Sequence, residues 1–378
     1  MSDIELSVFY FPNFHKGDKH NEAWHGHDWT EWNLMKHAKP RFEGHEIPTP
    51  LWGYEDESDP DVMEKKIKAM KDHAITNVLF DWYWYEDGPF LNKCLEEGFL
   101  KAKNNKDIKF SLMWANHNWL DIHPISLAYY HHQLVELSGH QSVESIYKAF
   151  AYIIKNYFSQ DNYYKIENKL FFSIYEINML VDSFGGLEEA KEGLKVFRNM
   201  VREAGLGELH LNAVVWGCRV LQGESEKTID GEALKEIGFD SVTSYVWVHE
   251  HPIPTFPAYE YKDFVNDAKG DFERLTKQYK GLPYYPNISV GWDASARANQ
   301  TDNFVNVGYP FGGVVINNTP EVFKSACEMV KEEILKSDLK TKMITINAWN
   351  EWTEGSYLEP DTKYGYKKLE VLKEVFGK

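Results

Sequence analysis

The sequence predicts an α/β fold: a single (β/α)8 TIM barrel over residues 1–378, with long loops at its C-terminal face. Apolar, β-branched and aromatic runs of strand length recur eight times, and segments with helical periodicity separate most of them. The runs carry few polar interruptions, which is typical of parallel strands covered on both faces. We expect the strands near residues 6–14, 77–84, 109–116, 170–176, 209–216, 241–247, 286–292 and 343–349.

A doubly wound open sheet is the alternative architecture. It usually carries a glycine-rich phosphate turn after its first strand, whereas this chain reads FPNFHKG there, without GxGxxG. The sequence has no linker, low-complexity block or internal repeat, so we expect one domain. Long loops over residues 14–59 and 247–285 would then decorate the active face of the barrel.

Helix signals follow between the strands in chain order. Asp59 with Pro60, and later Thr319 with Pro320, have the N-cap and first-turn pattern. Gly205 is expected in the left-handed conformation that ends a helix. Inward-facing stripes are expected at Met63, Ile67 and Met70; Val143, Ile146, Phe150, Ile153 and Tyr157; Leu187, Leu194, Phe197 and Val201; Phe323, Cys327, Val330 and Ile334; and Leu369, Leu372 and Phe376.

The charge balance narrows the class of partner. Asp and Glu number 58 against 41 Lys and Arg, for a formal net charge of −17. Such a surface repels phosphate backbones and anionic lipids, so we expect no nucleic-acid partner and no membrane binding. The sequence lacks an apolar run of about 18 residues, so we expect no membrane insertion. The N-terminus lacks a signal-peptide pattern, which predicts a cytoplasmic protein unless a signal peptide has been trimmed, when it would be periplasmic or secreted.

Aromatic residues gather at the predicted C-terminal ends of the strands. The 13 Trp, 22 Tyr and 22 Phe make 15% of the chain, and the strand ends read FYFPNFH, FDWYWYE, MWANHNW, IYE, VVWG, YVW, GWD and NAWNEW. Sugar rings pack on aromatic planes and hydrogen-bond to carboxylates and amides, so this pattern predicts an oligosaccharide or polysaccharide site; large core residues are the alternative. The predicted substrate-binding residues are Tyr10, His15, Trp32, Asp81, Tyr83, Trp84, Asn116, His117, Trp119, Glu176, Trp216, Tyr245, Trp247, Trp292, Asp293, Trp349, Asn350 and Trp352.

Two carboxylates after the last strand are the predicted catalytic pair. Glu351 and Glu354 are three residues apart where the chain must turn at Gly355. In a helical or turn conformation such positions lie roughly 5–6 Å apart on one side. That separation suits glycoside cleavage, in which one carboxyl group is ionised and the other protonated. Two solvated loop glutamates are the simpler alternative, which the flanking Trp349 and Trp352 disfavour.

The segments around these residues resemble a known family. NAWNEWTEGSYLEP, with FYFPNFH, DWTEWNLMKHAKPRFEGH, DPDVMEKKIKAMKDHAITNVLFDWYWYEDG and SLMWANHNW, is similar to the glycoside hydrolase family 99-like proteins. That group also carries the name WbsX-type glycosyltransferases and is related to family 99 endo-α-mannosidases and endo-α-mannanases. The resemblance runs from about Val8 to Asp361, and NEWxEG followed by LEP is its most specific part.

The resemblance implies a barrel enzyme that cleaves α-mannoside-like linkages with retention. It implies that Glu351 is the base that deprotonates the sugar's 2-hydroxyl, which forms a 1,2-anhydro sugar, and that Glu354 is the general acid/base. Relatives commonly show WANENW where this chain has WANHNW, so His117 implies altered substrate contacts. A glycosyltransferase of surface-polysaccharide synthesis and a non-catalytic glycan-binding barrel are the other readings.

We expect no metal ion and no cofactor. His25, His27 and Asp28 lie in a histidine-rich loop, but no matching Cys or carboxylate spacing supports a metal site. Asp59-Pro60-Asp61 has the form of the DxD motif of nucleotide-sugar enzymes, yet its place at a helix start predicts capping.

Overall fold

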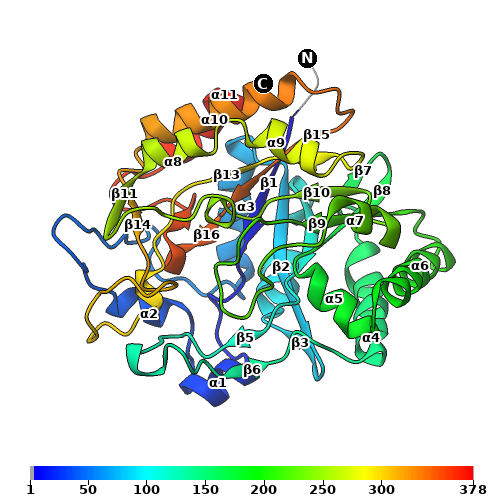
Figure 1. The fold of residues 1–378 in the computed structure, drawn as a ribbon, viewed down its shortest axis with the longest axis horizontal. Coiled ribbons are helices and arrows are strands. Elements are labelled where there is room, and N and C mark those ends of the chain that lie inside the picture. The colour runs from blue at the N-terminus through cyan, green and yellow to red at the C-terminus, as the bar shows by residue number, and fades with distance from the viewer. Residues whose placement is uncertain (1–3, 378) are drawn as a thin grey trace.

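The structure, a computed structural model, describes residues 4–377, and one large sheet lies at its centre (Figure 1). The sheet has eight parallel positions: β1 (Ile4–Tyr10), β2 (Asn77–Tyr85), β4 (Lys109–Trp114), β8 (Lys169–Ile174), β9 (Leu209–Val214), β10 (Ser241–Thr243), β12 (Tyr284–Tyr285) with β13 (Asn287–Ser289), and β15 (Lys342–Asn347). Neighbouring strands follow the order β12-β10-β9-β8-β4-β2-β1-β15-β13.

The seventh position closes the sheet into a barrel. β12 pairs with β10 and β13 pairs with β15, all in parallel, and only Pro286 separates β12 from β13. Proline has no N–H to donate, but its carbonyl accepts from the backbone N–H of Thr345 at 2.9 Å. The predicted (β/α)8 barrel is therefore confirmed.

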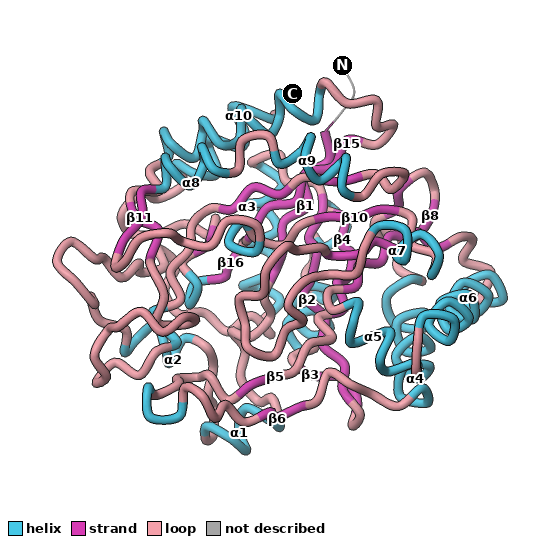
Figure 2. Tube along the Cα trace, viewed as in Figure 1, coloured by secondary structure: helices cyan, strands magenta, loops and turns pink. Residues whose placement is uncertain are grey.

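Helices cover the outside of the barrel, and long loops join them at its C-terminal face (Figure 2). The helices are α1 (Lys19–His25), α2 (Trp32–His37), α3 (Pro60–Asp72), α4 (Val143–Ile153), α5 (Ile177–Phe184), α6 (Leu187–Glu203), α7 (Gly231–Ile237), α8 (Tyr261–Asp267), α9 (Asp271–Gln278), α10 (Pro320–Leu335) and α11 (Lys367–Phe376). Short π and 3-10 turns are η1 (Cys94–Gly98), η2 (Phe99–Lys101), η3 (Asn105–Asp107), η4 (Leu127–Tyr129), η5 (Ile154–Phe158), η6 (Trp247–His249), η7 (Ser295–Arg297) and η8 (Trp352–Glu354). The remaining strands are β3 (Gly88–Phe90), β5 (Trp119–Leu120), β6 (Val135–Leu137), β7 (Lys165–Ile166), β11 (Ala258–Glu260), β14 (Val314–Ile316), β16 (Asn350–Glu351) and β17 (Ser356–Tyr357).

The capping signals lie where the sequence predicts them. The side chain of Asp59 accepts from the backbone of Asp61 at the start of α3, and that of Thr319 accepts from the backbone of Val322 at the start of α10. Gly205, with φ of 72°, follows the end of α6. The expected loop over residues 247–285 is different, because it contains β11, α8 and α9 and so forms a crossover rather than a long active-face loop.

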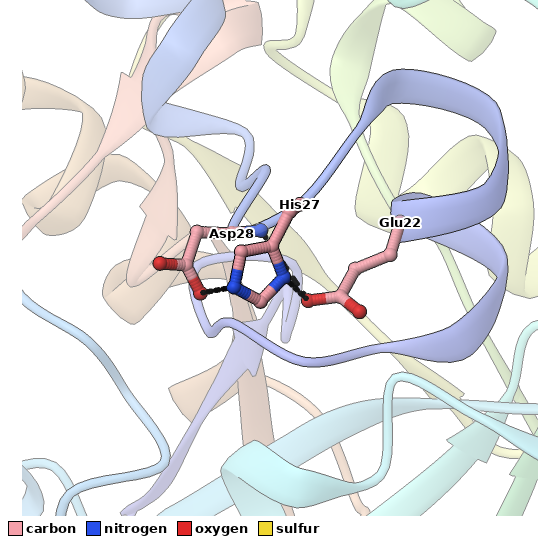
Figure 3. Close-up of side chains that lie close together, drawn as sticks. All are labelled: Glu22, His27 and Asp28. Carbon is pink, nitrogen blue, oxygen red and sulfur yellow. Dashed lines mark hydrogen bonds and ion pairs between the residues drawn. The ribbon is translucent and has the colours of Figure 1, made fainter.

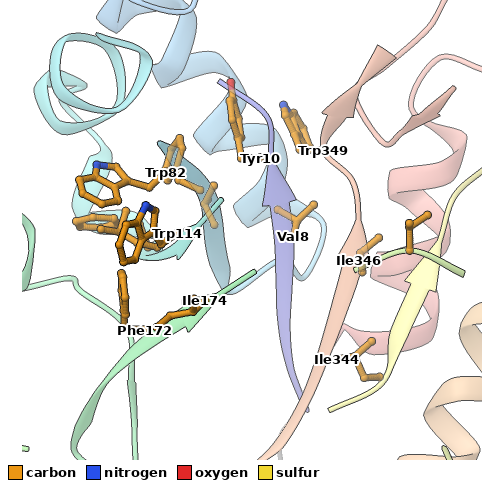
Figure 4. Close-up of a cluster of buried hydrophobic side chains, with 14 of the residues drawn as sticks. Val8, Tyr10, Trp82, Trp114, Phe172, Ile174, Ile344, Ile346 and Trp349 are labelled. Carbon is orange, nitrogen blue, oxygen red and sulfur yellow. The ribbon is translucent and has the colours of Figure 1, made fainter. Parts of the chain in front are cut away.

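Alternate residues of each strand face different environments. Outward side chains pack against the helices in one large apolar core, part of which Figure 4 shows with Val8, Trp82, Phe172 and Ile346. Inward side chains form a separate, largely aromatic cluster inside the barrel and at its C-terminal face. Because side chains alternate along a strand, this period of two decides which strand-end residues reach the site.

The barrel interior is more polar than the predicted apolar runs suggest. Small polar side chains inside the barrel form buried hydrogen bonds between strands: Asn77 with Ser7 and Ser111, Ser173 with Asn212, Asn212 with Ser241, and Thr345 with Thr243 and Asn287. This network satisfies polar groups that would otherwise be costly to bury. Within residues 4–377, no helix combines the length and the apolar character needed to cross a bilayer.

Candidate active site

A short hairpin after the last barrel strand carries Glu351 and Glu354. Glu351 ends β16, which pairs antiparallel with β17, and η8 connects the two strands. Gly355 follows η8 in the left-handed conformation, with φ of 65°, and lets the chain turn back. The tight turn presents both carboxyl groups to the same side chain, Arg297.

A buried cluster of charged side chains holds this hairpin in place through Asn350 and Trp352. Asn350 donates from Nδ2 to Glu57 Oε1 at 3.0 Å, and Trp352 donates from Nε1 to Glu359 Oε2 at 2.8 Å. Lys66 of α3 pairs with both of these glutamates, at 2.6 Å and 2.8 Å. All five side chains are buried. Asn350 and Trp352 of NEWxEG and Glu359 of LEP therefore anchor the turn.

One arginine connects the two candidate catalytic carboxyl groups. Arg297, at the end of η7, donates through Nη1 to Glu354 Oε1 at 2.5 Å and through Nη2 to Glu351 Oε1 at 3.1 Å. Its Nε donates to Glu31 Oε1 at 3.0 Å, and the Tyr309 hydroxyl donates to Glu354 Oε1 at 2.7 Å. The arginine and the three glutamates are buried, so these contacts act with little screening by water.

Burial and charge give the three glutamates different proton affinities. Burial, followed by repulsion from Glu354, raises the pKa of Glu351 well above its usual range, against the opposing effect of Arg297. Burial also raises the pKa of Glu354, while Arg297 and Tyr309 oppose the rise. For Glu31, burial is outweighed by the charge of Arg297 and by hydrogen bonds from Thr353 and Arg297, so its pKa is lowered. The site can thus hold ionised and protonated carboxyl groups side by side.

Tyr245 connects the pair to a third carboxyl group. Its hydroxyl lies 3.0 Å from Asp81 Oδ2 and 3.1 Å from Glu351 Oε2. The other oxygen of Asp81 is buried and has no hydrogen-bond partner in the described part of the chain. Burial raises the pKa of Asp81 well above its usual range. A protonated Asp81 could therefore offer a hydrogen bond to a ligand in the cleft.

These groups line an open cleft at the C-terminal face of the barrel. Tyr83, Trp119 and Trp292 give the lining aromatic surfaces. The Trp119 ring stacks on His123 with 5.1 Å between the centroids, which fixes its plane. The cleft therefore combines ring faces with acidic and amide groups, as recognition of a sugar requires.

A second acidic group lies in the same lining. Tyr175 donates to Glu224 Oε1 at 2.5 Å, and His249 Nε2 lies 3.4 Å from Glu224 Oε2. Burial would raise the pKa of Glu224, but His249 and hydrogen bonds from Tyr175 and Val220 lower it to about 2. Glu224 is therefore an ionised hydrogen-bond acceptor beside the cleft.

The structure brings eight of the predicted site residues together in the cleft lining. They are Asp81, Tyr83, His117, Trp119, Tyr245, Trp292, Glu351 and Glu354. His117 faces the carbonyl of Asn118 with Nδ1 at 2.8 Å, and burial lowers the pKa of its imidazole, so the ring is neutral near pH 7. Substrate contact by these residues remains a prediction.

Four predicted residues lie in the outer core instead of the cleft. Tyr10, Trp84, Trp247 and Trp349 pack among the residues between barrel and helices. Figure 4 shows Tyr10 and Trp349 beside each other on this side, and the Tyr10 hydroxyl meets Met63 Sδ at 3.4 Å. Their inclusion in the site is corrected, because large aromatic residues at strand ends also fill the core.

Three further residues support the strand ends rather than line the cleft. Asn116 donates to the carbonyl of Glu176 at 2.8 Å, and the Glu176 side chain accepts from the backbone and the hydroxyl of Ser225. The Trp216 indole donates to the Ser225 carbonyl at 3.0 Å. Their polar groups are thus satisfied within the protein.

The last five are likewise held by protein partners away from the cleft. Asn350 and Trp352 anchor the hairpin, as described above. The Trp32 indole donates to the carbonyl of Glu55 at 2.7 Å, Asp293 pairs with His45 at 2.7 Å, and the His15 ring faces the carbonyl of Lys16 at 3.1 Å.

Sequence reasoning missed several groups that the structure places at the site. Arg297, Tyr309 and His249 lie in loops without a motif, so no spacing distinguishes them. Glu31 lies within the quoted segment DWTEWNLMKH, and its position between two tryptophans was the available signal. Glu224 lies in a loop whose path depends on the closed barrel.

A group of potential metal ligands lies in the histidine-rich loop, outside the cleft. Figure 3 shows His27 between Glu22 and Asp28, with its Nδ1 at 3.0 Å from Glu22 and its Nε2 at 3.8 Å from Asp28. The His27 side chain is 85% exposed. Exposed ion pairs explain this arrangement without a metal.

Curated relatives match nearly the whole chain. Two proteins described as "Uncharacterized protein WxcX", from two strains of Xanthomonas campestris pv. campestris, are each 26% identical over 382 residues. The match covers 98% of this chain and 49% of each relative. The chain therefore spans about half the length of the curated relatives it matches.

Solved structures share the fold. A "Glycoside hydrolase-like protein" superposes with a TM-score of 0.63 at 16% identity, covering 100% of this chain and 94% of that one. The GH99 endo-alpha-mannosidase from Bacteroides thetaiotaomicron gives 0.57 at 14% identity, covering 100% and 96%. At such identities the likeness shows a common barrel architecture.

The family comparison agrees with the motifs. The sequence model of the family described as Glycosyltransferase WbsX matches residues 6–372, nearly the whole chain. The resemblance found from NEWxEG and LEP is confirmed by this match and by the solved structures. The chain therefore belongs to the family described as Glycosyltransferase WbsX, and it has the barrel fold of glycoside hydrolase-like proteins.

Proposed function

We propose that the protein is a retaining glycoside hydrolase that cleaves α-mannoside-like glycans. The observation that supports it most directly is the buried pair of Glu351 and Glu354 on one turn, in a cleft lined with aromatic rings. Two carboxyl groups with raised pKa values can exchange a proton with a substrate near neutral pH.

The family resemblance implies a neighbouring-group route. Glu351 takes the proton of the sugar's 2-hydroxyl, O2 bonds to the anomeric carbon, and the exocyclic bond breaks as Glu354 protonates the leaving oxygen. Water then attacks the anomeric carbon of the 1,2-anhydro sugar, gives its proton to Glu354, and O2 regains a proton from Glu351. Two inversions at the anomeric carbon give retention.

The charges of the cleft disfavour a sugar-nucleotide donor. Among the described residues that line the cleft, Arg297 is the only Lys or Arg side chain, and three glutamates already contact it. A diphosphate would enter this acidic cleft without a free cation to bind it. Glycosyl transfer remains the second candidate because the family carries that name.

A glycan screen tests the proposal. We would incubate the protein with α-mannan, N-glycan and bacterial polysaccharide fragments and follow the first-formed anomer by NMR. We expect one of them to be cleaved with retention, and Glu351→Gln and Glu354→Gln each to reduce the rate at least about 100-fold. Glu188→Gln, at an exposed residue of α6, is the matched control and should keep the wild-type rate.

Three other outcomes would contradict the proposal that the protein is a hydrolase. Wild-type rates in both active-site variants would show that the pair is not catalytic. Tight calorimetric binding of GDP-mannose with transfer to an acceptor would favour the transferase. Saturable glycan binding with no cleavage over long incubation would favour a non-catalytic binding barrel.

A further inference from the structure

Arg297 lies closer to one carboxyl group of the pair than to the other. Its Nη1 is 2.5 Å from Glu354, whereas its Nη2 is 3.1 Å from Glu351. Glu354 also accepts from Tyr309 on the same oxygen. Charge-assisted hydrogen bonds of this length favour the ionised form of their acceptor, so both contacts favour a charged Glu354.

Glu31 holds the arginine in that position. Its Oε1 accepts from Arg297 Nε and from the hydroxyl of Thr353, which lies between the two glutamates of the pair, and its Oε2 accepts from Asn13. Glu31 is fully buried and contacts both η7 and η8. It therefore fixes the guanidinium and the turn relative to each other.

On the opposite side of Glu351, the contacts of Tyr245 point to a proton on Glu351 or on Asp81. Tyr245 has one hydrogen, yet its oxygen lies about 3 Å from a carboxyl oxygen of Asp81 and from one of Glu351. If both groups were ionised, one carboxylate would face the phenol oxygen with no proton between them. A proton on Glu351 or Asp81 removes that repulsion, and both groups have raised pKa values.

We propose that Arg297, anchored by Glu31, is a positioning residue that keeps Glu354 ionised and leaves the proton of the pair on Glu351 in the ligand-free protein. The other charged and titratable groups around the pair act in different directions, because the negative charges of Glu31 and Glu224 raise the pKa of Glu354 and oppose the effect of Arg297. Glu31 and Glu224 carry negative charge, His123 is neutral near pH 7 because burial lowers its pKa to about 3, and Asp81 favours its neutral form.

The catalytic consequence rests on the proposed function, whereas the proton's position does not. A protonated Glu351 with an ionised Glu354 is the arrangement required for attack of water on the 1,2-anhydro sugar. The first step, cleavage of the glycosidic bond, needs an ionised Glu351 and a protonated Glu354. Substrate must therefore separate Glu354 from Arg297 and Tyr309, so that the proton of the pair can move to Glu354 before the glycosidic bond breaks.

Carboxyl 13C NMR tests the proton's position directly. In protein labelled at Glu Cδ, the signals lost in Glu351→Gln and in Glu354→Gln assign the pair. At pH 7 we expect the Glu351 signal at the protonated position and the Glu354 signal at the ionised one. In Arg297→Met, the Glu354 titration should move up by about 1 pH unit or more, because the cation is lost. Arg202→Met, which breaks an exposed pair with Glu208, is the matched control and should leave both signals unchanged.

Two results would overturn the proposal: a protonated Glu354 in the wild type, or an unchanged Glu354 titration in Arg297→Met. If that variant fails to fold because Glu31 loses its partner, Glu31→Gln combined with Arg297→Met removes the buried pair without changing the net charge. The upward shift of Glu354 is expected there too. Absence of glycan cleavage with the expected NMR titration would reject the proposed function alone, and cleavage with the proton on Glu354 would reject this inference alone.

Discussion

At the scale of single residues, Glu351 stands out as a buried acid whose position is costly to the stability of the fold. It is 2% exposed, and its neighbours include Glu354 and Asp81. Only Arg297 offers a nearby positive charge among the described residues of the cleft lining, and that charge is shared. The cleft therefore keeps acidic groups where water solvates them poorly, which is the environment that raises the pKa of a carboxyl group.

Glu351→Gln is expected to stabilise the folded protein at pH 7. The raised pKa means that the folded state holds a proton that the unfolded chain releases above about pH 4.3, so Glu351 lowers stability as the pH rises from there. Glutamine cannot ionise, so it removes that penalty and the variant should unfold at a higher urea concentration than the wild type at pH 7. Urea unfolding from pH 4 to 8 measures it, and the gain should shrink toward pH 4. An equal gain in Glu188→Gln, or destabilisation at pH 7, would contradict the assigned protonation.

Residues of the site differ in how far sequence alone could identify them. Glu351 and Glu354 could be predicted because one local motif contains both. Glu31 and Arg297 are 266 positions apart, and only closure of the barrel makes them partners. Their pairing is a tertiary contact that no local spacing encodes.

At the scale of elements, the hairpin of β16, η8 and β17 is the part on which the site depends most. Gly355 ends η8 with φ of 65°, and a Cβ built there would lie 2.6 Å from Asp293 Cβ and 2.9 Å from Asp293 N. The glycine is thus required for two reasons, its backbone conformation and the close approach of the loop after β13.

Gly355→Ala is expected to cost more than Gly205→Ala, its matched control. Gly205 also has positive φ, at 72°, but a Cβ there meets nothing within 4 Å. The control should lose about 1–2 kcal/mol of unfolding free energy through backbone strain alone. Gly355→Ala should lose at least about 1 kcal/mol more, because the turn must shift. Urea unfolding of both variants makes the comparison, and equal losses would show that the loop yields freely.

Elements also show what periodicity could and could not predict. The barrel, its strands and the caps at Asp59 and Thr319 follow from local patterns. The assignment of aromatic residues to the site does not, because the aromatic residues at one strand end divide between the cleft side and the outer core. Of the 13 Trp, only Trp119 and Trp292 line the cleft, since strand alternation or indole hydrogen bonds place most of the others in the protein core.

At the scale of the whole molecule, the barrel is a ring whose first and last strands are neighbours. β1 pairs with β15, so Ile4 lies opposite Lys342, and β15 pairs in turn with β13. A ring of parallel strands joins residues far apart in sequence, and each strand depends on two neighbours.

The ring predicts one cooperative unfolding transition. Losing any strand opens the barrel and exposes both the outer core and the polar interior, so partly unfolded states should be unstable. Far-UV circular dichroism and tryptophan fluorescence should report the same urea midpoint. Separate midpoints would show that parts of the ring unfold independently, which would contradict the single-domain expectation.

The ion cluster of Lys66, Glu57 and Glu359 explains why the motif NEWxEG–LEP says little about substrate specificity. Through Asn350 and Trp352 this cluster fixes where the two carboxyl groups stand, and it lies on the far side of the hairpin from the cleft. Asn350, Trp352 and Glu359, which make NEWxEG and LEP distinctive, therefore hold the two acidic residues in position. Under the proposed function, the choice of sugar would depend on other residues that line the cleft, His117 and Trp119 among them. Two proteins that share the motif can thus have the same acid pair and different residues in the rest of the cleft lining.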